Sequence, residues 1–493
     1  MGHWRKTNIN FIRKGCFRLR RIYKILYVIV GVSIILYFLS SLYFYYQEKP
    51  EANVLLQSLP VVQKQTRLLV VAPHCDDETL GCAGVIHDVI EGGGQVMVVF
   101  MTNGDGFTVA TEEQFHRLFL TKEDYVNSGY ARQIETLHAL HLLGVSEKQI
   151  VFLGFPDRGL RAIWSDYWNN GQPYQSRYTG SDHSPYTTSY QQNAPYTGET
   201  VLNNLEQIMH TFQPNLILAP HPADEHPDHA STWAFVVAAF MKLSKGELEP
   251  GVNLYTYLIH RGDFPIPHGY KTDALLSPPK PLYQTQPSSW LQYTINSDME
   301  MLKEQSIKEY VSQIRVPIMS SLLYSFIRKN ELFEEVHFPI MTQVPMDIDL
   351  RNIENWSNQE PILVNPLGVN LFGALEPKGK ITSISSCIQD NTIWMRFHIP
   401  GFSKKRNQYN VSIVTFSCTD NQMDREMQVV YFSRTNTSLS PDNIVRYPDD
   451  VIIKISSPPT KLDNFFFIRA ETKNQFGIMF NHTVWQPAFL TRF

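Results

Sequence analysis

Arg67-Leu-Leu-Val-Val-Ala-Pro-His-Cys-Asp-Asp-Glu78 joins an apolar run directly to a cluster of metal-binding and acid–base side chains. A second stretch, Asn215-Leu-Ile-Leu-Ala-Pro-His-Pro-Ala-Asp-Glu-His-Pro-Asp-His229, repeats this arrangement further along the chain. Each apolar run is rich in aliphatic residues, which is typical of a parallel strand buried on both faces. Ligand sites of α/β folds lie beyond the carboxyl ends of such strands. We therefore expect both polar clusters at the site-bearing edge of a parallel sheet.

Strand and helix patterns alternate from residue 67 to about residue 260. We predict strands at 67–72, 96–100, 150–153, 215–219 and 254–259, and helices at about 79–90, 122–143, 199–212 and 228–243. Repeated βα units of this length predict a parallel sheet with right-handed crossovers. The expected fold class is therefore α/β, with a first domain over residues 67–269.

Three further segments depart from this alternation. Residues 164–198 concentrate Tyr, Trp, Ser and Gln and contain almost no aliphatic residues, which favours either a substrate-binding lid or a disordered insertion. Residues 270–380 form an extension that we leave unassigned. Residues 381–493 carry short alternating strands separated by polar turns, and this spacing predicts a β-sandwich-like domain.

The N-terminal residues have the pattern of a membrane anchor. Residues 25–44 carry no charge and have about the length that crosses a bilayer, so we predict a transmembrane helix. Residues 1–24 are basic and contain no acidic residue, so the positive-inside rule predicts a cytoplasmic segment followed by an extracytoplasmic chain. Residues 45–66 would form a stalk in this single-pass protein of the cell membrane. The alternatives are a cleaved signal peptide, although residues 42–46 lack a small-residue cleavage site, and a buried N-terminal helix.

The charge and the cysteine content argue against two classes of protein. The formal net charge is −4, and residues 1–24 hold eight Lys and Arg residues, so the rest of the chain is acidic. Nucleic acid is not an expected partner, because phosphate binding requires a basic surface. Five cysteines are few for a disulfide scaffold. Cys387 and Cys418 either pair with each other or remain free thiols.

The two polar clusters supply the donors of a hydrolytic metal site. Such a site typically has three protein ligands and leaves a position for water. His74 and Asp77 lie in one tight turn and can converge on one ion, with His229 of the second cluster as the third ligand. Local alternatives exist, because a histidine after a strand is often a cap and acidic residues before a helix often complement its dipole. The presence of both clusters in one chain favours the metal site.

The remaining side chains of the clusters are suited to proton transfer. Asp76 is surplus to the ligands, so it is the candidate general base that takes a proton from the activated water. His226 is suited to stabilising the oxyanion or protonating the leaving group. Asp228 can orient a histidine, and Glu78 is a further supporting carboxylate. The predicted catalytic residues are therefore Asp76, His226 and Asp228.

These clusters resemble the paired signatures of the PIG-L/LmbE-like deacetylases. The family has His-Pro-Asp-Asp-Glu in the first position and His-x-Asp-His in the second, and the resemblance covers about residues 67–260. It implies a Rossmann-like, zinc-dependent catalytic domain that removes the acetyl group from N-acetylglucosamine units. The resemblance also implies the role of each residue. The zinc ligands would be His74, Asp77 and His229. Asp76 would be the general base, and His226 the electrostatic or acid partner.

Weaker matches and one departure accompany these signatures. Thr102-Asn-Gly-Asp105 resembles an acidic turn of the family, and the resemblance implies that Arg132 and Asp157 bind substrate. Arg132 can also be interpreted as a helix-surface partner of Glu135. Cys75 stands where the family has proline, and we expect its thiol to point away from the metal.

The sequence therefore predicts a membrane-anchored zinc hydrolase that removes acetyl groups from N-acetylglucosamine units of an extracytoplasmic glycan or glycoconjugate. Its expected partners are that glycan and the membrane, through one N-terminal helix; no protein partner follows from the sequence. One alternative is a carbohydrate-binding surface protein without turnover. Another is a deacetylase of small glycosides similar to N-acetylglucosaminyl-phosphatidylinositol, whose cytosolic orientation the basic N-terminus opposes.

Overall fold

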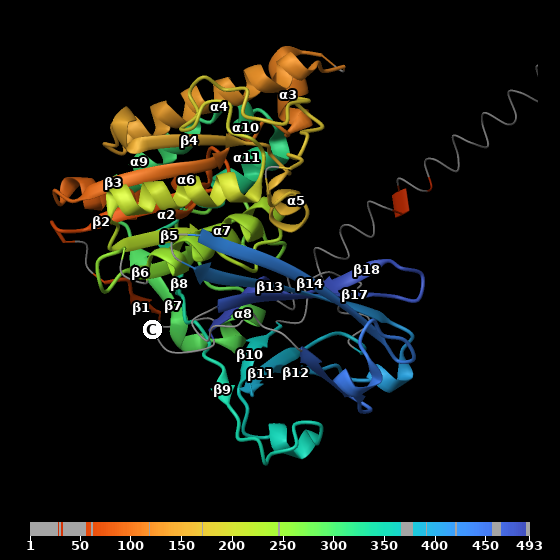
Figure 1. Cartoon of the computed structure of the whole chain (residues 1–493). Coiled ribbons are helices and arrows are strands. Elements are labelled where there is room, and N and C mark those ends of the chain that lie inside the picture. The colour runs from red at the N-terminus through yellow and green to blue at the C-terminus, as the bar shows by residue number, and fades with distance from the viewer. Residues whose placement is uncertain are drawn as a thin grey trace, which may run out of the picture. The chain divides into compact units, whose positions relative to one another are not determined.

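The computed structural model describes most of the chain from residue 56 onward. The described residues are 28, 31–32, 56–60, 63–117, 119–169, 171–244, 247–365, 378–390, 392–419, 422–455 and 465–489. The chain forms two compact units, Met1–Asn53 and Val54–Phe493. The strands and helices from β1 onward belong to the second unit, which is a mixed α/β fold with several sheets (Figure 1).

An eight-stranded sheet forms the centre of the first domain. Its parallel strands are β2 (Arg67–Ala72), β3 (Gln95–Thr102), β4 (Ile150–Phe155), β5 (Leu216–Pro220) and β6 (Asn253–Tyr257). They lie in the order β4-β3-β2-β5-β6, and all neighbours in this series are parallel. The chain builds outward from β2 to β4 and then returns to β5 on the other side of β2. This reversal is a switch point, where α/β sheets bind ligands, and the two polar clusters follow β2 and β5.

Helices cover both faces of this sheet. On one face α2 (Asp77–Glu91) and α4 (Lys122–Leu142) share a core with Leu68 and Val70 of β2. On the other face Leu69 and Val71 of β2 share a core with α5 (Leu160–Ser165), α6 (Gly198–Phe212) and α7 (Pro227–Leu243). Successive side chains of a strand point to opposite faces, so β2 is apolar throughout because both of its faces are buried. A short helix, α3 (Thr108–Phe115), precedes α4.

Residues 270–335, within the unassigned extension, complete the first domain. They form β7 (Trp290–Thr294), β8 (Asn330–Glu335), α8 (Lys280–Thr285), α9 (Ser297–Lys308), α10 (Val311–Ile314) and α11 (Pro317–Tyr324). β8 pairs antiparallel with β6, β7 pairs antiparallel with β8, and β1 (Gln57–Ser58), from the predicted stalk, pairs parallel with β7. The buried Glu331 carboxylate accepts hydrogen bonds from the backbone of Gly84 and Val85 and pairs with Lys303 at 2.8 Å. The extension therefore supports α2, the helix that begins at the first polar cluster.

Two largely antiparallel sheets form the C-terminal part of the chain (Figure 1). One contains β9 (Thr342–Gln343), β10 (Pro361–Val364), β11 (Ser383–Gln389), β12 (Thr392–His398), β15 (Ile444–Arg446) and β16 (Asp450–Ile455). The other contains β13 (Gln408–Thr419), β14 (Gln422–Ser433), β17 (Phe465–Lys473), β18 (Met479–His482) and β19 (Gln486–Phe489).

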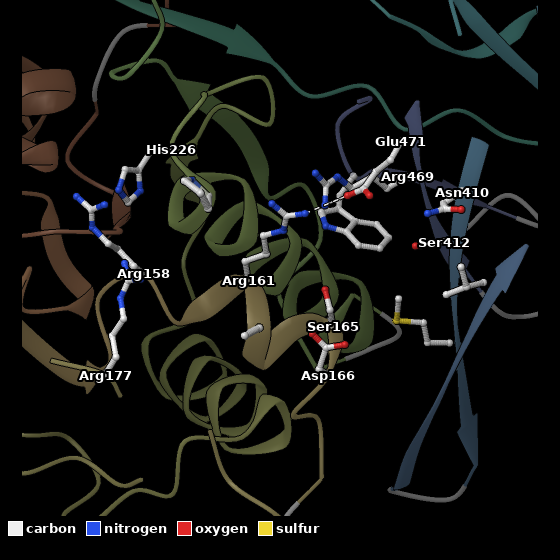
Figure 2. Close-up of a pocket in the computed structure, with 15 residues that line it drawn as sticks. Arg158, Arg161, Ser165, Asp166, Arg177, His226, Asn410, Ser412, Arg469 and Glu471 are labelled. Carbon is white, nitrogen blue, oxygen red and sulfur yellow. Dashed lines mark hydrogen bonds and ion pairs between the residues drawn. The ribbon is translucent and has the colours of Figure 1, made fainter. Parts of the chain in front are cut away.

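The sheet that contains β13 packs on two neighbours. On β17, Phe466 and Ile468 belong to the core shared with the other C-terminal sheet, whereas Phe467 belongs to a core of the first domain. This alternation has the period of two that a strand requires. Arg161 on α5 also reaches Glu471 on β17 at 3.0 Å across the same contact (Figure 2).

The aromatic residues of segment 164–198 contribute to packing. Trp164 is fully buried, with its ring centroid 4.9 Å from that of Phe235 on α7 and 5.3 Å from that of Phe467 on β17. Trp164 therefore joins the first domain to the β13 sheet. Two tyrosines of the segment are buried as well, Tyr186 and Tyr196. These three rings are not available to stack on a sugar.

We expect Trp164→Ala to lower the free energy of unfolding by about 3–5 kcal/mol, because it removes a large buried ring and leaves a cavity. Urea unfolding of the full chain measures this loss. Tyr190→Ala is the matched control, because Tyr190 is 40% exposed and its removal should change the free energy by about 0.5 kcal/mol or less. Equal effects of the two substitutions would contradict the role of Trp164 in the core.

The predicted N-terminal transmembrane helix needs correction. A membrane span requires about twenty consecutive apolar residues in one helix. Among the helices in the described part of the chain, none combines the necessary length and apolarity. Of the predicted span 25–44 only residues 28, 31 and 32 are described, and residues 1–24 lie outside the described residues. Membrane association through such a helix is therefore not supported, and the cellular location stays a prediction.

Cys75, Cys82 and Cys387 are buried and free. Cys387 lies on β11, whereas Cys418 lies on β13 in the opposite sheet. Of the two alternatives for Cys387, the structure shows the free thiol. Burial raises the pKa of this thiol to about 12, so it is protonated at neutral pH.

Candidate metal centre and active site

The first polar cluster forms a tight turn between β2 and α2. Asp76, directly before α2, has φ 155° and ψ −27°, a backbone conformation that favours glycine. Strained backbone of this kind is typical of functional sites. The turn directs two neighbouring carboxylates to different partners, since Asp77 contacts His229 whereas Asp76 contacts Arg132.

The second polar cluster begins helix α7. His226 is the N-cap residue, and Pro227 occupies the first helical position, where its missing N–H needs no partner. Asp228 and His229 follow in the first turn and are fully buried. The helix start therefore aims His229 toward the first cluster, because β5 and β2 are neighbours in the sheet.

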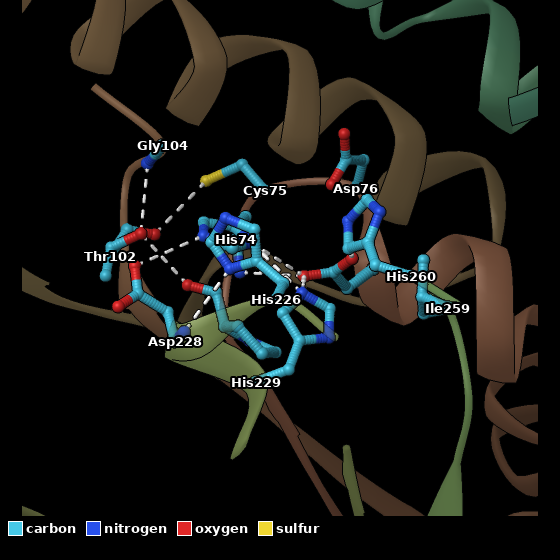
Figure 3. Close-up of polar contacts among 12 residues, drawn as sticks. His74, Cys75, Asp76, Thr102, Gly104, His226, Asp228, His229, Ile259 and His260 are labelled. Atoms are coloured by element: carbon cyan, nitrogen blue, oxygen red, sulfur yellow. Dashed lines mark hydrogen bonds and ion pairs between the residues drawn. The ribbon is translucent and has the colours of Figure 1, made fainter. Parts of the chain in front are cut away.

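Three donor atoms from the two clusters converge, and Figure 3 labels two of the residues that supply them, His74 and His229. His74 Nδ1 lies 3.2 Å from both Asp77 Oδ2 and His229 Nε2, and the latter two atoms are 3.1 Å apart. All three side chains are buried. A tetrahedral zinc site with bonds of about 2.0–2.1 Å separates its ligand atoms by about 3.3–3.4 Å. The spacing and the chemistry of these donors therefore fit a small divalent metal ion.

His260 is a fourth candidate donor, which the sequence analysis did not single out. Its Nε2 lies 3.8 Å from Asp77 Oδ1, and that oxygen is buried without a hydrogen-bond partner among the described residues. His260 follows β6, the strand beside β5. The available signal was a histidine directly after a predicted strand, the same signal that identified His74.

A second group of donors shares His74. Atoms of His74, Asp157 and His226 lie within 4.8 Å of one another. His74 Nε2 is 3.4 Å from Asp157 Oδ1 and 3.6 Å from Asp228 Oδ2, so these carboxylates face the ring nitrogen that points away from Asp77. A metal-binding histidine commonly donates its second N–H to a carboxylate. The Nδ1 side of His74 is therefore the side on which a metal could bind, while Asp157 and Asp228 lie where they can orient the ring.

Asp224 lies where it can orient His229 in the same way. The sequence analysis assigned no role to Asp224. Its Oδ2 lies 3.0 Å from His229 Nδ1 and accepts the backbone N–H of His260 at 2.9 Å. Its Oδ1 accepts the backbone N–H of His226, also at 2.9 Å. Burial opposes ionisation of this carboxyl, but the neighbouring His229 lowers its pKa overall. Asp224 thus fixes His229 and ties together two loops of the site.

Asp76 is held apart from the ligands by Arg132 of α4. Arg132 Nη2 lies 3.1 Å from Asp76 Oδ2 and donates to the Cys75 carbonyl at 2.7 Å. Arg132 Nη1 donates to the Gly104 carbonyl at 3.1 Å. Burial raises the pKa of Asp76 to about 7, against the opposing effect of Arg132. A general base works best with a pKa near the working pH, so Asp76 has the environment of a base.

The two predicted substrate-binding residues lie around this centre. The terminal nitrogens of Arg132 bond to the first turn, while Glu135, its alternative partner, accepts two hydrogen bonds from Ser312 at 2.7 Å. Asp157 accepts the backbone N–H of Gly106 at 2.9 Å and faces His74. Both residues therefore position other parts of the site, and direct contact with substrate stays a prediction.

His226 lies beside the three donor atoms, and its hydrogen bonds define the tautomer of its ring. Its Nδ1 accepts the backbone N–H of Asp228 at 3.3 Å, so Nε2 carries the proton of the neutral ring. Its ring centroid lies 4.6 Å from that of His74. Burial and the imidazoles of His74 and His229 lower the pKa of His226. His226 is therefore a neutral hydrogen-bond donor at neutral pH.

Glu78 and Cys75 face away from the three donor atoms. Glu78 accepts hydrogen bonds from the hydroxyls of Tyr310 and Thr79, and burial raises its pKa to about 7. Cys75 Sγ lies 4.0 Å from the Thr102 carbonyl (Figure 3), and burial raises the pKa of this thiol to about 12. A protonated thiol is a weak metal ligand, so Cys75 does not compete with the three donors.

Fold and site together define a class of protein. Two histidines and an aspartate converge at the switch point of a parallel sheet, beside a further carboxylate with a pKa of about 7. This arrangement is typical of metal-dependent hydrolases. Residues 69–240 match the PIG-L family, described as GlcNAc-PI de-N-acetylase. The chain contains a PIG-L family domain at these residues, which confirms the resemblance noted from the sequence.

Individual relatives are also deacetylases. The 1D-myo-inositol 2-acetamido-2-deoxy-alpha-D-glucopyranoside deacetylases of Mycobacterium sp. strains KMS and JLS are each 30% identical over 177 residues, 35% of this chain and 49% of the relative. The chain thus spans about half the length of these relatives. The solved structure of N,N'-diacetylchitobiose deacetylase from Pyrococcus horikoshii is 18% identical and covers 55% of this chain and 83% of its own, with a TM-score of 0.33. The activity named for these relatives, deacetylation, belongs to the enzyme class that the sequence predicts, an amidohydrolase.

Proposed function

We propose that this protein is a zinc-dependent deacetylase that hydrolyses the acetamide of N-acetylglucosamine units in a glycan or glycoconjugate. The observation that carries the proposal is the convergence of three donor atoms within 3.2 Å of one another, with Asp76 beside them but bonded to Arg132. The PIG-L family domain and the acetamido sugar in the names of the mycobacterial relatives support the substrate class.

Zinc is the proposed ion. His74, Asp77 and His229 would hold it, and three protein ligands of this chemistry leave one position open for water or substrate. When bound, the ion supplies Lewis acidity, which lowers the pKa of water and polarises the amide carbonyl. The imidazoles are kept in orientation by the carboxylates of Asp157, Asp224 and Asp228.

The side chains around the ligands supply the proton transfers. Asp76, once ionised, accepts a proton from the attacking water while Arg132 holds its carboxylate in place. His226 offers its Nε2–H to the developing oxyanion. The proton taken up by Asp76 passes to the leaving nitrogen as the carbon–nitrogen bond breaks. The oxygen of the water thereby becomes part of acetate, and the proton that Asp76 carried becomes part of the amine.

Acetate release by the full purified chain tests this proposal. With chitotetraose as substrate, we expect acetate and free amine in equal amounts, loss of both after a chelator, and recovery when zinc is added back. Circular dichroism of the chelated protein is the control that the fold persists. Release that is insensitive to the chelator would contradict the metal centre. No release from any N-acetylglucosamine glycan would contradict the activity and favour a carbohydrate-binding protein without turnover.

A further inference from the structure

A cavity lies beside the candidate metal centre, between the first domain and the β13 sheet (Figure 2). Its volume is about 590 Å³, within the range of small-molecule binding sites. His226 lines this cavity, and its ring centroid is also 4.6 Å from that of the proposed ligand His74. A molecule bound in the cavity therefore lies next to His226, which also borders the candidate metal centre.

The cavity is positively charged, although the whole chain carries a formal net charge of −4. Four arginines line it, and the acidic lining residues are Asp166 and Glu471. The arginines come from the first domain, from segment 164–198 and from β17, and Figure 2 shows them along the cavity: Arg158, Arg161, Arg177 and Arg469. Three separate parts of the chain thus direct the same charge to one place.

The two acidic residues do not balance this charge. Glu471 pairs with both Arg161 at 3.0 Å and Arg469 at 3.4 Å. Within the described part of the chain, Arg158 and Arg177 form no ion pair with a carboxylate; Arg177 instead donates to the Tyr178 hydroxyl at 2.5 Å. Both of these arginine side chains are solvent-exposed, so they are accessible to an anionic ligand in the cavity.

The guanidinium of Arg469 is destabilised by burial beside the other arginines of the cavity. Its side chain is only 11% exposed and lies over the Trp485 ring, at 5.9 Å from the ring centroid. Burial lowers its pKa to about 10, and Arg161 adds to the shift. Guanidinium groups that are partly removed from water are stabilised by hydrogen bonds to carboxylate or phosphate.

We propose that this cavity binds an anionic group of the substrate, carried by a sugar or substituent next to the N-acetylglucosamine unit that is deacetylated. A carboxylate and a phosphate present the same chemistry to the arginines, namely oxygen acceptors with a negative charge. This inference rests on the proposed deacetylase function and adds that the substrate is an acidic glycan or glycoconjugate. An anionic group can pair with the exposed Arg158 and Arg177, whereas a neutral sugar cannot.

Paired substrates test the inference on the full chain. A hyaluronan tetrasaccharide supplies a carboxylate beside N-acetylglucosamine, N-acetylglucosamine 1-phosphate supplies a phosphate, and chitotetraose is neutral. We expect kcat/KM for at least one anionic probe to exceed that for chitotetraose by about tenfold or more, because a charged hydrogen bond contributes about one order of magnitude in affinity. The probe with the larger advantage identifies the anion. Equal values for all three would overturn the inference.

Four variants assign this preference to the cavity. Arg177→Gln and Arg469→Gln should each lower kcat/KM for the preferred anionic probe by about tenfold and leave chitotetraose within about twofold. Glu471→Gln should raise kcat/KM for the anionic probe, because it frees two arginines; a merely structural role would lower it. Lys148→Gln is the control of equal charge change, because Lys148 precedes β4 at the opposite edge of the sheet and should alter neither value. Equal losses on neutral and anionic probes would overturn the inference.

Direct binding separates a failure of the inference from a failure of the proposed function. Calorimetric titration of the hyaluronan tetrasaccharide and of N-acetylglucosamine 1-phosphate requires no turnover. If the wild-type chain releases no acetate but still binds an anionic probe in an Arg469-dependent way, the deacetylase proposal fails and the anion site persists. If acetate is released but neither probe binds more weakly to the arginine variants, the anion site is wrong.

Discussion

Asp76→Asn is expected to lower the turnover number by about two to four orders of magnitude, the usual contribution of a positioned general base. The amide has nearly the same shape as the carboxylate but cannot accept the proton of water. The metal content should stay at one ion per chain, because Asp76 contacts Arg132 and not the three donor atoms. Steady-state acetate release and elemental analysis of the same sample measure the two quantities.

Glu78→Gln is the matched control for this substitution. Glu78 is also buried and also has its pKa raised to about 7 by burial, but it bonds to Tyr310 and Thr79. Its turnover should therefore change by less than about tenfold. An unchanged rate in Asp76→Asn together with a large loss in Glu78→Gln would transfer the role of base to Glu78.

His229→Ala is expected to remove both the bound metal and the activity. The imidazole supplies one of the three donor atoms that lie within 3.2 Å of one another. The fourth candidate, His260, lies further away, with its Nε2 3.8 Å from Asp77 Oδ1, so the remaining donors should hold zinc much more weakly. Elemental analysis should fall from about one ion per chain to near zero, and acetate release should fall to the uncatalysed background. Urea unfolding of the metal-free wild type and the metal-free variant shows whether the fold is retained.

His226→Ala distinguishes the two groups of donors that share His74. If the metal binds to His74, Asp77 and His229, the His226 variant keeps the ion and loses turnover. If the metal instead binds to His74, Asp157 and His226, the outcome is reversed: the His226 variant loses the ion and the His229 variant keeps it. The pair of variants therefore shows whether the metal binds on the Nδ1 side or on the Nε2 side of the His74 ring.

The two polar clusters were accessible to sequence reasoning because their geometry is local. An aliphatic run followed by Pro73-His74 and a helix start at Asp77 places donors at the end of a strand without knowledge of distant residues. The same holds for Pro227 and His229 after β5. Parallel pairing of β2 with β5 then brings the two strand ends together.

Asp224 and His260 illustrate what local reasoning misses. Asp224 meets His229 Nδ1 within the second polar cluster, and its carboxylate also accepts the backbone N–H of His260 from the loop after β6. His260 approaches Asp77 because β6 takes its place beside β5. Likewise Arg132 reaches Asp76 from α4, a partner that spacing along the helix, which also offered Glu135, does not identify. The contacts of His260 and Arg132 depend on the order of strands and helices rather than on spacing along the chain.

The sequence by itself determined the alternation of strands and helices and the residue types of the candidate metal centre, because apolar periodicity and the donors in one turn are properties of short segments. Its prediction of an N-terminal transmembrane helix is not supported, because no helix in the described part of the chain is long and apolar enough to cross a membrane. Only the tertiary structure decided that residues 270–335 complete the first sheet, that Trp164 joins it to the β13 sheet, and that four arginines meet beside His226. Burial, raised pKa values and charge clusters arise between segments distant in sequence, so they exist only once the chain has folded.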